Sequence, residues 1–220
     1  RGNRRRLSLN SSVPGVKAHD FGEGAAFEAA AAQLRSARFR SELQVHEIPA
    51  PAQIAQRSVA FAAGVIHGTA RPAESAGDSP YGAGRLVLMH DPASEPDWGG
   101  PFRIVCFAQA PLEMEIGVDP FIAEVAWSWL IDALESRDAA YAFASGTATK
   151  TLSTGFGTLQ DQEDAAQIEI RASWTPLGDD LAPHGEAWSE LLCLLAGLPQ
   201  QEGVASLRAH RGSRGGKRGA

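Results

Sequence analysis

Apolar residues recur with a helical period near the start of the chain. Between Phe27 and Ala37 they fall at i, i+3, i+4, i+7 and i+10, a spacing that gathers them on one face of a helix. Arg35, Arg38 and Arg40 follow, where the carbonyl groups at a helix end favour positive charge. This pattern predicts a helix that begins near Phe27, after two dozen residues without periodicity.

Two further helices are predicted, over residues 119–135 and 183–197. The first has a favourable N-cap in Asp119, and Pro120 suits its first turn. Only a narrow polar stripe interrupts its apolar positions, so we expect it to be buried on more than one side; the stripe is Glu124, Ser128, Asp132 and Glu135. The second helix should stop at Gly197, just before Pro199.

Five segments have the pattern of strands. Residues 57–67 favour a strand, with a helix as the alternative because of their alanines, and 47–51 read as an extended connector. The apolar runs 86–89 and 102–107 flank a Gly- and Pro-containing loop, so we expect them to pair antiparallel. Alternating patterns predict the last two strands, at 141–152 and 168–174.

These elements predict an α+β fold, an antiparallel sheet of about five strands with helices packed on it. The expected order is α-β-β-β-α-β-β-α. We expect a disordered basic segment at 1–24, a single α+β domain at 25–202 and a disordered Arg/Gly-rich tail at 203–220.

Charge is distributed unevenly along the 220 residues. The formal net charge is −6, but residues 1–24 carry +3 and residues 203–220 carry +5, which leaves −14 for the region between them. An acidic body is not expected to bind nucleic acid, whereas a basic tail can follow a phosphate backbone. The sequence therefore offers two interpretations of the C-terminal end, a solubilising extension or an RNA-binding tail whose basic residues are Arg208, Arg211, Arg214, Lys217 and Arg218.

Two cysteines, Cys106 and Cys193, lie within apolar runs. Such thiols pack as small hydrophobic groups, and we expect both to be reduced in a cytoplasmic protein. Neither a membrane-spanning apolar run nor a secretory signal is predicted from the sequence.

Searches for chemical motifs give little. The six histidines are scattered and no Cys-x-x-Cys pair occurs, so no metal site and no cofactor are predicted. Three glycine-containing stretches, at 82–84, 146–151 and 155–157, lack the remaining residues of nucleotide-binding loops. The carboxylates at Glu124, Asp132 and Glu135 could bind a divalent cation, but a solvated helix face accounts for them equally well, and we favour that interpretation.

His90 and Asp91 form the main catalytic candidate, at the end of a predicted buried strand. His90 could transfer protons, and Trp98 lies in the loop that follows. However, adjacent residues in a strand face opposite ways, and Asp-Pro commonly opens a turn. We favour the structural interpretation of this pair.

Several segments together resemble an actinobacterial family catalogued as domain of unknown function 3000. The resemblance covers about residues 27–200, and its more specific features are the Trp-Ser-Trp-Leu helix and the Ala-Ser-Trp-Thr-Pro strand end. The matching segments are EIPAP (47–51), GRLVLMHDP (84–92), FRIVCFAQAPLE (102–113), DPFIAEVAWSWLIDALE (119–135), GTATKT (146–151), IEIRASWTP (168–176) and AWSELLCLLAGLP (187–199). The family name implies no activity and no catalytic residues. The element order is also similar to that of type III secretion chaperones and YbjN-like proteins, which implies a helix-covered antiparallel sheet.

The favoured functional hypothesis is a non-catalytic adaptor or chaperone-like protein. It would bind an unknown protein partner, or a second copy of itself, through an apolar surface that includes Trp127, Trp129 and Trp98. The alternatives are an enzyme with a loop-built site near His90, Asp91 and Trp98, and an RNA-associated protein that acts through its tail.

Overall fold

The computed structural model describes residues 18–66 and 79–200, with the side chains of 18–21 left out. Six antiparallel strands form one sheet in the order β1-β2-β3-β4-β6-β5. The strands are β1 (Leu43–Ile48), β2 (Arg57–Val65), β3 (Ala83–His90), β4 (Phe102–Leu112), β5 (Tyr141–Ser153) and β6 (Ala165–Pro176). The helices are α1 (Ala18–Arg35), α2 (Glu95–Trp98), α3 (Met114–Gly117), α4 (Ile122–Ser136) and α5 (Ala182–Leu195).

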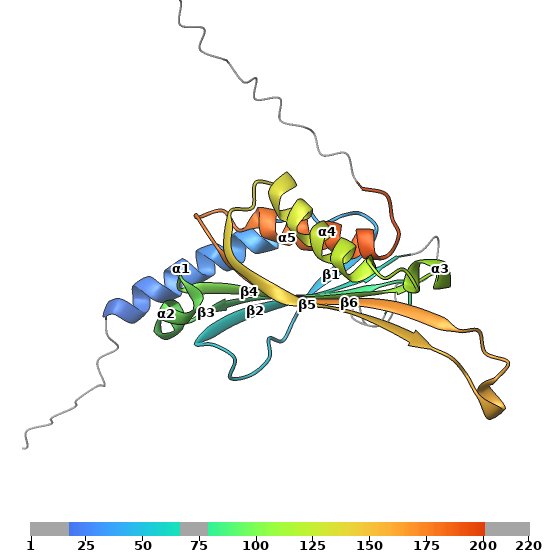
Figure 1. Ribbon diagram of the computed structural model, residues 1–220. Coiled ribbons are helices and arrows are strands. Elements are labelled where there is room, and N and C mark those ends of the chain that lie inside the picture. Colours follow the sequence, from blue (N-terminus) through green and yellow to red (C-terminus); the bar gives the residue numbers. More distant parts are fainter. Residues whose placement is uncertain (1–17, 67–78, 201–220) are drawn as a thin grey trace, which may run out of the picture.

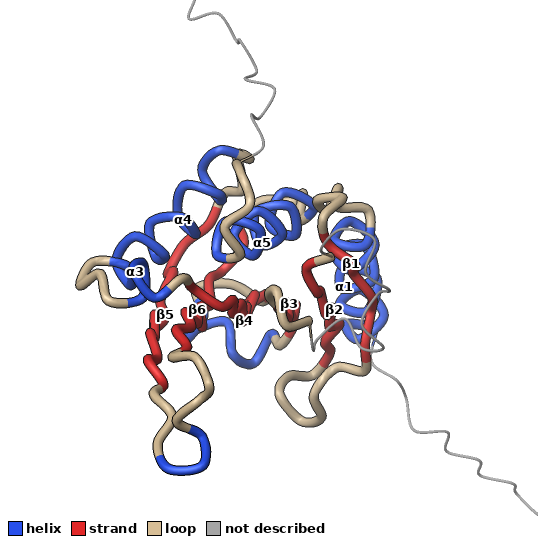
Figure 2. Tube along the Cα trace, turned by 90° about the vertical axis from the view of Figure 1, so that its right-hand side faces the viewer, coloured by secondary structure: helices blue, strands red, loops and turns tan. Residues whose placement is uncertain are grey.

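The three long helices lie on one side of the sheet (Figures 1 and 2). Helix α5 packs over β2, β3 and β4, while α4 covers β5 and β6 and lies beside α5 on one flank. Helix α1 contacts the other flank of α5. The structure is therefore two-layered, with a helix-covered face and an open face of the sheet.

The core lies between the sheet and these helices. In β4 the buried side chains are Ile104, Cys106, Ala108 and Ala110, and in β6 they are Ala166, Ile168, Ile170, Ala172 and Trp174. Residues between them are more exposed, as expected for strands with one covered face. Trp174 and Trp188 are the largest fully buried side chains.

The α+β class and the antiparallel sheet are confirmed, including the pairing of β3 with β4. The sheet has six strands where about five were expected, because β1 occupies part of the predicted connector and pairs with β2 along its whole length. The prolines that suggested a connector, Pro49 and Pro51, follow the strand and end it. The element order thus gains one strand before the central helix.

Helix α1 begins at Ala18, so the last seven residues of the expected basic N-terminal segment, 18–24, are helical. Residues 18–24 lack an apolar stripe and contain Gly22 and Gly24, so the sequence pattern did not indicate a helix there. The remainder of that segment, residues 1–17, and the expected tail at 203–220 lie outside the described residues.

Helix α4 begins later than predicted. It starts at Ile122, and Asp119 instead accepts a hydrogen bond from the Phe121 amide (2.8 Å) in the turn before it. Its fully buried residues are Ile122, Ala126, Leu130, Ala133 and Leu134. The expected burial on more than one side is confirmed, because α4 packs on β5 and β6 and also against α5.

The end of α5 follows the prediction closely. Gly197 adopts a left-handed backbone (φ 73°) directly after the C-cap residue Ala196. The Leu198 amide donates to the Cys193 carbonyl (2.9 Å) and the Gly197 amide to the Leu194 carbonyl (3.0 Å). These two bonds form the Schellman motif that glycine at this position favours.

Candidate functional site

His90 lies inside the molecule at the end of β3. Its side chain is 2% exposed and packs between Phe102 (ring centroids 4.7 Å apart) and Phe27 (6.1 Å). Burial, and then the charge of Arg57, lower its pKa, so the neutral form is favoured. This environment gives His90 an aromatic packing role and no open path to a substrate.

Asp91 does not form a dyad with His90. Its carboxylate accepts hydrogen bonds from the Ala93 amide (3.0 Å) and the Ser94 hydroxyl (3.2 Å), and so caps the short 3₁₀ turn that follows. Trp98 is half-buried at the end of α2, and its carbonyl accepts a hydrogen bond from the Thr175 hydroxyl. His90, Asp91 and Trp98 are thus near each other in sequence, but each makes its own local contacts and they do not form a joint site.

A polar hollow of about 280 Å³ lies at the opposite end of β4 and β6. Its described lining includes Gln109, Thr151, Ser153 and Gln167. The side-chain amide of Gln167 (Nε2) donates a hydrogen bond to the side-chain oxygen of Gln109 (Oε1, 2.9 Å). None of the described lining residues is titratable, so they supply no general acid, base or thiolate nucleophile.

Trp127 and Trp129 both lie half-buried on α4. Trp127 packs over β5, where a methyl group added to Gly146 would lie 2.9 Å from the indole ring. These tryptophans therefore belong to the underside and flank of α4, and the strongly exposed apolar side chains come from residues around them.

Five of those apolar side chains form a surface that we call the edge patch. They come from the chain that leads into α4, from its first turn and from β5 below: Ile116 (44% exposed), Val118 (56%), Phe121 (62%), Val125 (38%) and Leu152 (48%). The segments are held together, because the Lys150 ammonium donates to the Asp119 carbonyl (2.8 Å) and Gly117 packs against Leu152 and Ala166. The sequence did not indicate this patch, since Phe121 and Val125 lie in the helix predicted to be buried and Leu152 lies in a predicted strand far along the chain.

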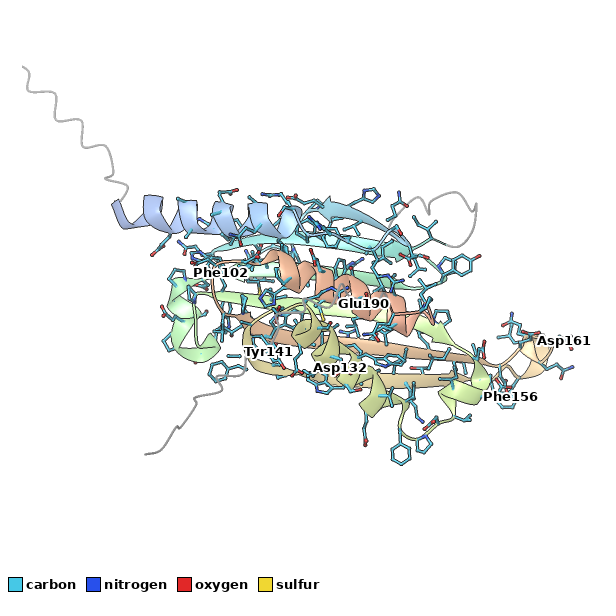
Figure 3. The ribbon with its side chains drawn as sticks, turned by 90° about the horizontal axis from the view of Figure 1, so that it is seen from above. Phe102, Asp132, Tyr141, Phe156, Asp161 and Glu190 are labelled. Carbon is cyan, nitrogen blue, oxygen red and sulfur yellow. The ribbon has the colours of Figure 1, made fainter. Side chains whose placement is uncertain are left out.

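The edge patch adjoins an unpaired strand edge. β5 is one of the two terminal strands of the sheet, with β1 at the far side; it pairs with β6 alone and runs for 13 residues. Its connection to β6 carries two further exposed apolar side chains, Phe156 (80%) and Leu159 (50%). Figure 3 shows Phe156 and Asp161 at the tip of this hairpin, beyond the helices. An exposed strand edge beside apolar side chains is an arrangement that can bind another chain.

A buried ionic network surrounds Glu190 in the C-terminal half of α5. Glu190 is fully buried and accepts from Arg40 (3.2 Å) and Arg137 (2.9 Å). Arg40 also pairs with Glu42 and donates to the Pro199 carbonyl (2.8 Å). The network joins α4, α5 and the chain before β1, and its internal pairing indicates a structural role.

Cys106 and Cys193 are free and buried, as expected. Burial raises the pKa of each thiol to about 12, so neither is a reactive thiolate. Among the described residues, no group of three or more His, Cys, Asp or Glu side chains could hold a metal ion. Glu124, Asp132 and Glu135 of α4 are exposed. The five basic tail residues, from Arg208 to Arg218, lie outside the described part of the chain.

Within those limits no helix is long and apolar enough to cross a membrane. No curated protein and no solved structure matches the chain, so the expected likeness to type III secretion chaperones and YbjN-like proteins is not confirmed. Residues 23–205 match a family model described as Protein of unknown function (DUF3000). That match spans most of the chain and includes every segment on which the resemblance rested, and the chain therefore belongs to the DUF3000 family.

Proposed function

We propose that this protein is a non-catalytic, cytoplasmic protein-binding module of the adaptor or chaperone-like kind. The observation that carries the proposal is the edge patch next to the free edge of β5. Monomeric proteins rarely expose such apolar groups together, and a rim of polar residues around them is typical of a protein interface. The free, buried cysteines support the cytoplasmic assignment.

The first partner that we propose is a second copy of the chain. Two β5 strands can pair antiparallel across a two-fold axis, which joins two sheets into one and brings the two edge patches near each other. A strand of 13 residues with flanking apolar side chains offers contact on the scale of a stable interface, roughly 800 Å² on each side. Trp127 then supports the interface from beneath by holding α4 on β5.

Charge around the edge patch gives this dimer a signature. Glu113, Glu115 and Glu124 lie on the same segments and are exposed. In a two-fold dimer they face like charges, so added salt should strengthen association by screening the repulsion. A basic protein partner would show the opposite salt dependence.

Sedimentation equilibrium tests the proposal. The full chain should dimerise at micromolar concentration, and Val118→Ser/Phe121→Ser should raise the dissociation constant at least about tenfold, because two buried apolar contacts are lost. The matched control is Ile54→Ser/Leu177→Ser, which removes exposed apolar groups outside the patch (38% and 44% exposed) and should leave association unchanged.

A wild-type chain that stays monomeric to about 100 µM, a concentration at which even weak specific dimers form, would reject self-association. The proposal of a protein-binding surface would then require a different protein partner. The Val118→Ser/Phe121→Ser variant should fail to capture that partner, and the control variant should still capture it. Equal capture by both variants would reject the edge patch as the binding surface.

A further inference from the structure

The open face of the sheet has a composition unlike the rest of the molecule. Strand register places the following side chains on it: Arg85, Val87 and Met89 from β3; Arg103, Val105, Phe107 and Gln109 from β4; Gln167, Glu169, Arg171 and Ser173 from β6; and Ser145, Thr147 and Thr149 from β5. No long helix in the described chain covers this face (Figure 1). Apolar residues thus run along its centre, with hydroxyl groups and arginines around them.

The charge of this face is opposite to that of the body. In β3, β4, β5 and β6 it carries three arginines and one acidic residue, Glu169. The acidic residues of α4 lie on the opposite, helix-covered side of the sheet. Further acidic residues lie in α2, which contains Glu95 and Asp97, and in the β5–β6 connection, where Figure 3 shows Asp161 at the tip of the hairpin. The centre of the open face therefore presents a local positive field.

Arg103 is the best-defined group on this face. Its guanidinium donates to the hydroxyls of Thr175 (2.9 Å) and Ser173 (2.8 Å), to the Phe143 carbonyl (3.0 Å) and, at 3.4 Å, to the Ser145 hydroxyl. It forms no ion pair with any described residue, so its charge is held by neutral oxygens alone. Ser145 and Ser173 accept from Arg103 and keep their own protons to donate.

This arrangement fits a tetrahedral oxyanion. Ser145 and Ser173 are opposite each other in the β5–β6 register and both contact the Arg103 guanidinium. An incoming anion would supply the counter-charge that the half-buried Arg103 lacks. A phosphate group can accept from three or four donors at once, whereas a carboxylate is matched by a two-pronged arginine contact.

A second cationic position surrounds Phe107. In the sheet register Arg85 and Arg171 are its neighbours on either side. The Arg171 guanidinium carbon lies 5.4 Å from the Phe107 ring centroid, and its other contact is with Glu169. An aromatic ring between arginines, on a strand that also carries Arg103 four residues away, can stack a base while the arginines contact phosphates.

We propose that the open face binds single-stranded nucleic acid, with Arg103, Ser145 and Ser173 holding one phosphate and Arg85 and Arg171 flanking a base stacked at Phe107. Binding is weak, depends steeply on salt and shows little sequence preference. This site is separate from the edge patch and does not depend on the proposed dimer.

The test uses a full-length chain in which the basic tail residues are changed to glutamine, so that binding reports on the body: Arg208→Gln, Arg211→Gln, Arg214→Gln, Lys217→Gln and Arg218→Gln. Fluorescence anisotropy with a labelled oligouridylate of about ten nucleotides, a typical single-strand site size, measures the dissociation constant at about 50 mM salt. Three cationic contacts predict a logarithmic salt slope of about −2.

Removing the cationic contacts should weaken binding roughly tenfold, in Arg103→Gln and in Arg85→Gln/Arg171→Gln alike. Phe107→Leu should weaken it at least about fivefold by removing the stacking ring. The control Arg38→Gln makes the same charge change as Arg103→Gln at an exposed residue beside α5, and it should change the dissociation constant less than about twofold. Arg85 and Arg171 are exposed, so their double variant tests the site even if Arg103→Gln fails to fold.

Two results would overturn the proposal. The first is unchanged affinity in Arg85→Gln/Arg171→Gln. The second is competition by polyglutamate as strong as that by oligouridylate at equal charge, together with an unaffected Phe107→Leu variant, because the face would then recognise acidic protein segments and not nucleic acid.

Discussion

At the residue scale, His184 links stability to pH. It is fully buried, and its Nδ1 accepts a hydrogen bond from the Trp174 indole (3.1 Å). Burial lowers its pKa to about 4. Between its ordinary value of about 6.5 and pH 4, the unfolded chain binds a proton that the folded chain does not, so stability falls as the pH falls through this range, by about 3 kcal/mol for this group.

Urea unfolding at a series of pH values between 4 and 8 would measure this loss. His184→Asn keeps an acceptor for Trp174 and has no proton to gain, so the decline between pH 6.5 and 4 should become clearly shallower than in the wild type. The lowered pKa of His90 leaves some slope in the variant. Parallel curves for wild type and His184→Asn would show that His184 does not control this pH range.

The ionic network around Glu190 predicts a large effect from a small change. Glu190→Gln removes the shared counter-charge of Arg40 and Arg137 in a fully buried site and should cost about 3 kcal/mol or more of unfolding free energy. Glu47→Gln makes the same change in an exposed pair with Arg35 and should cost less than about 1 kcal/mol. Denaturant unfolding at pH 7 compares the two, and equal losses would contradict the structural role.

Contacts between side chains that are distant in sequence could not be predicted from the sequence. Arg40 and Glu190 are separated by 150 residues, and no local pattern pairs them. The position of His90 at a strand end was predicted, but its aromatic surroundings depend on Phe27 of α1 and Phe102 of the next strand. The turn at Asp91 could be predicted, because Asp-Pro favours turns through local geometry alone.

At the element scale, two glycines test how closely the elements pack. A methyl group on Gly146 would lie 2.2 Å from the Arg171 carbonyl oxygen and 2.9 Å from Trp127. Gly146→Ala should therefore destabilise the protein by about 1–3 kcal/mol through displacement of β6 or α4. Gly22→Ala meets nothing within 4 Å in α1 and should stabilise by up to about 1 kcal/mol.

Thermal unfolding of the two variants gives shifts of opposite sign if this account is correct. A neutral Gly146→Ala would mean that α4 is held loosely on β5. That result would also weaken the proposed dimer, since the edge patch depends on the position of α4.

Elements with strong local signals were predicted well. The end of α5 at Gly197 and the alternation of β6 both follow from sequence because one residue or one face decides them. β1 was missed because its six residues alternate poorly and only their pairing with β2 makes them a strand. The burial of α4 against the sheet and α5 was predicted, but its exposed first turn was not, because an apolar helix at a sheet edge has the same pattern as one inside a core.

At the scale of the whole molecule, the layer arrangement explains which surfaces remain available. Three helices cover one face of a six-stranded sheet and leave its open face and its two terminal strands, β1 and β5; of these strands only β5 adjoins the edge patch. The sequence predicted the fold class but not these surfaces, since strand order decides which strand lies at the edge. β6 lies between β4 and β5 because it pairs with its neighbour β5 and also with β4, which is distant in sequence. Periodicity within a segment cannot reveal such a pairing.

The final prediction concerns nucleic-acid binding by the whole chain, in which the basic tail and the open face can both contribute. Five tail charges, from Arg208 to Arg218, predict a contribution of about −3.5 to the logarithmic salt slope for a single strand, against about −2 for the three arginines of the open face. The two sets share no residue, so their effects on binding free energy should add. Neutralising the tail of the full chain should therefore reduce both the affinity for oligouridylate and its salt dependence more than the double substitution Arg85→Gln/Arg171→Gln does. If neutralising the tail changes neither quantity, the segment is a solubilising extension and any affinity for oligouridylate belongs to the sheet.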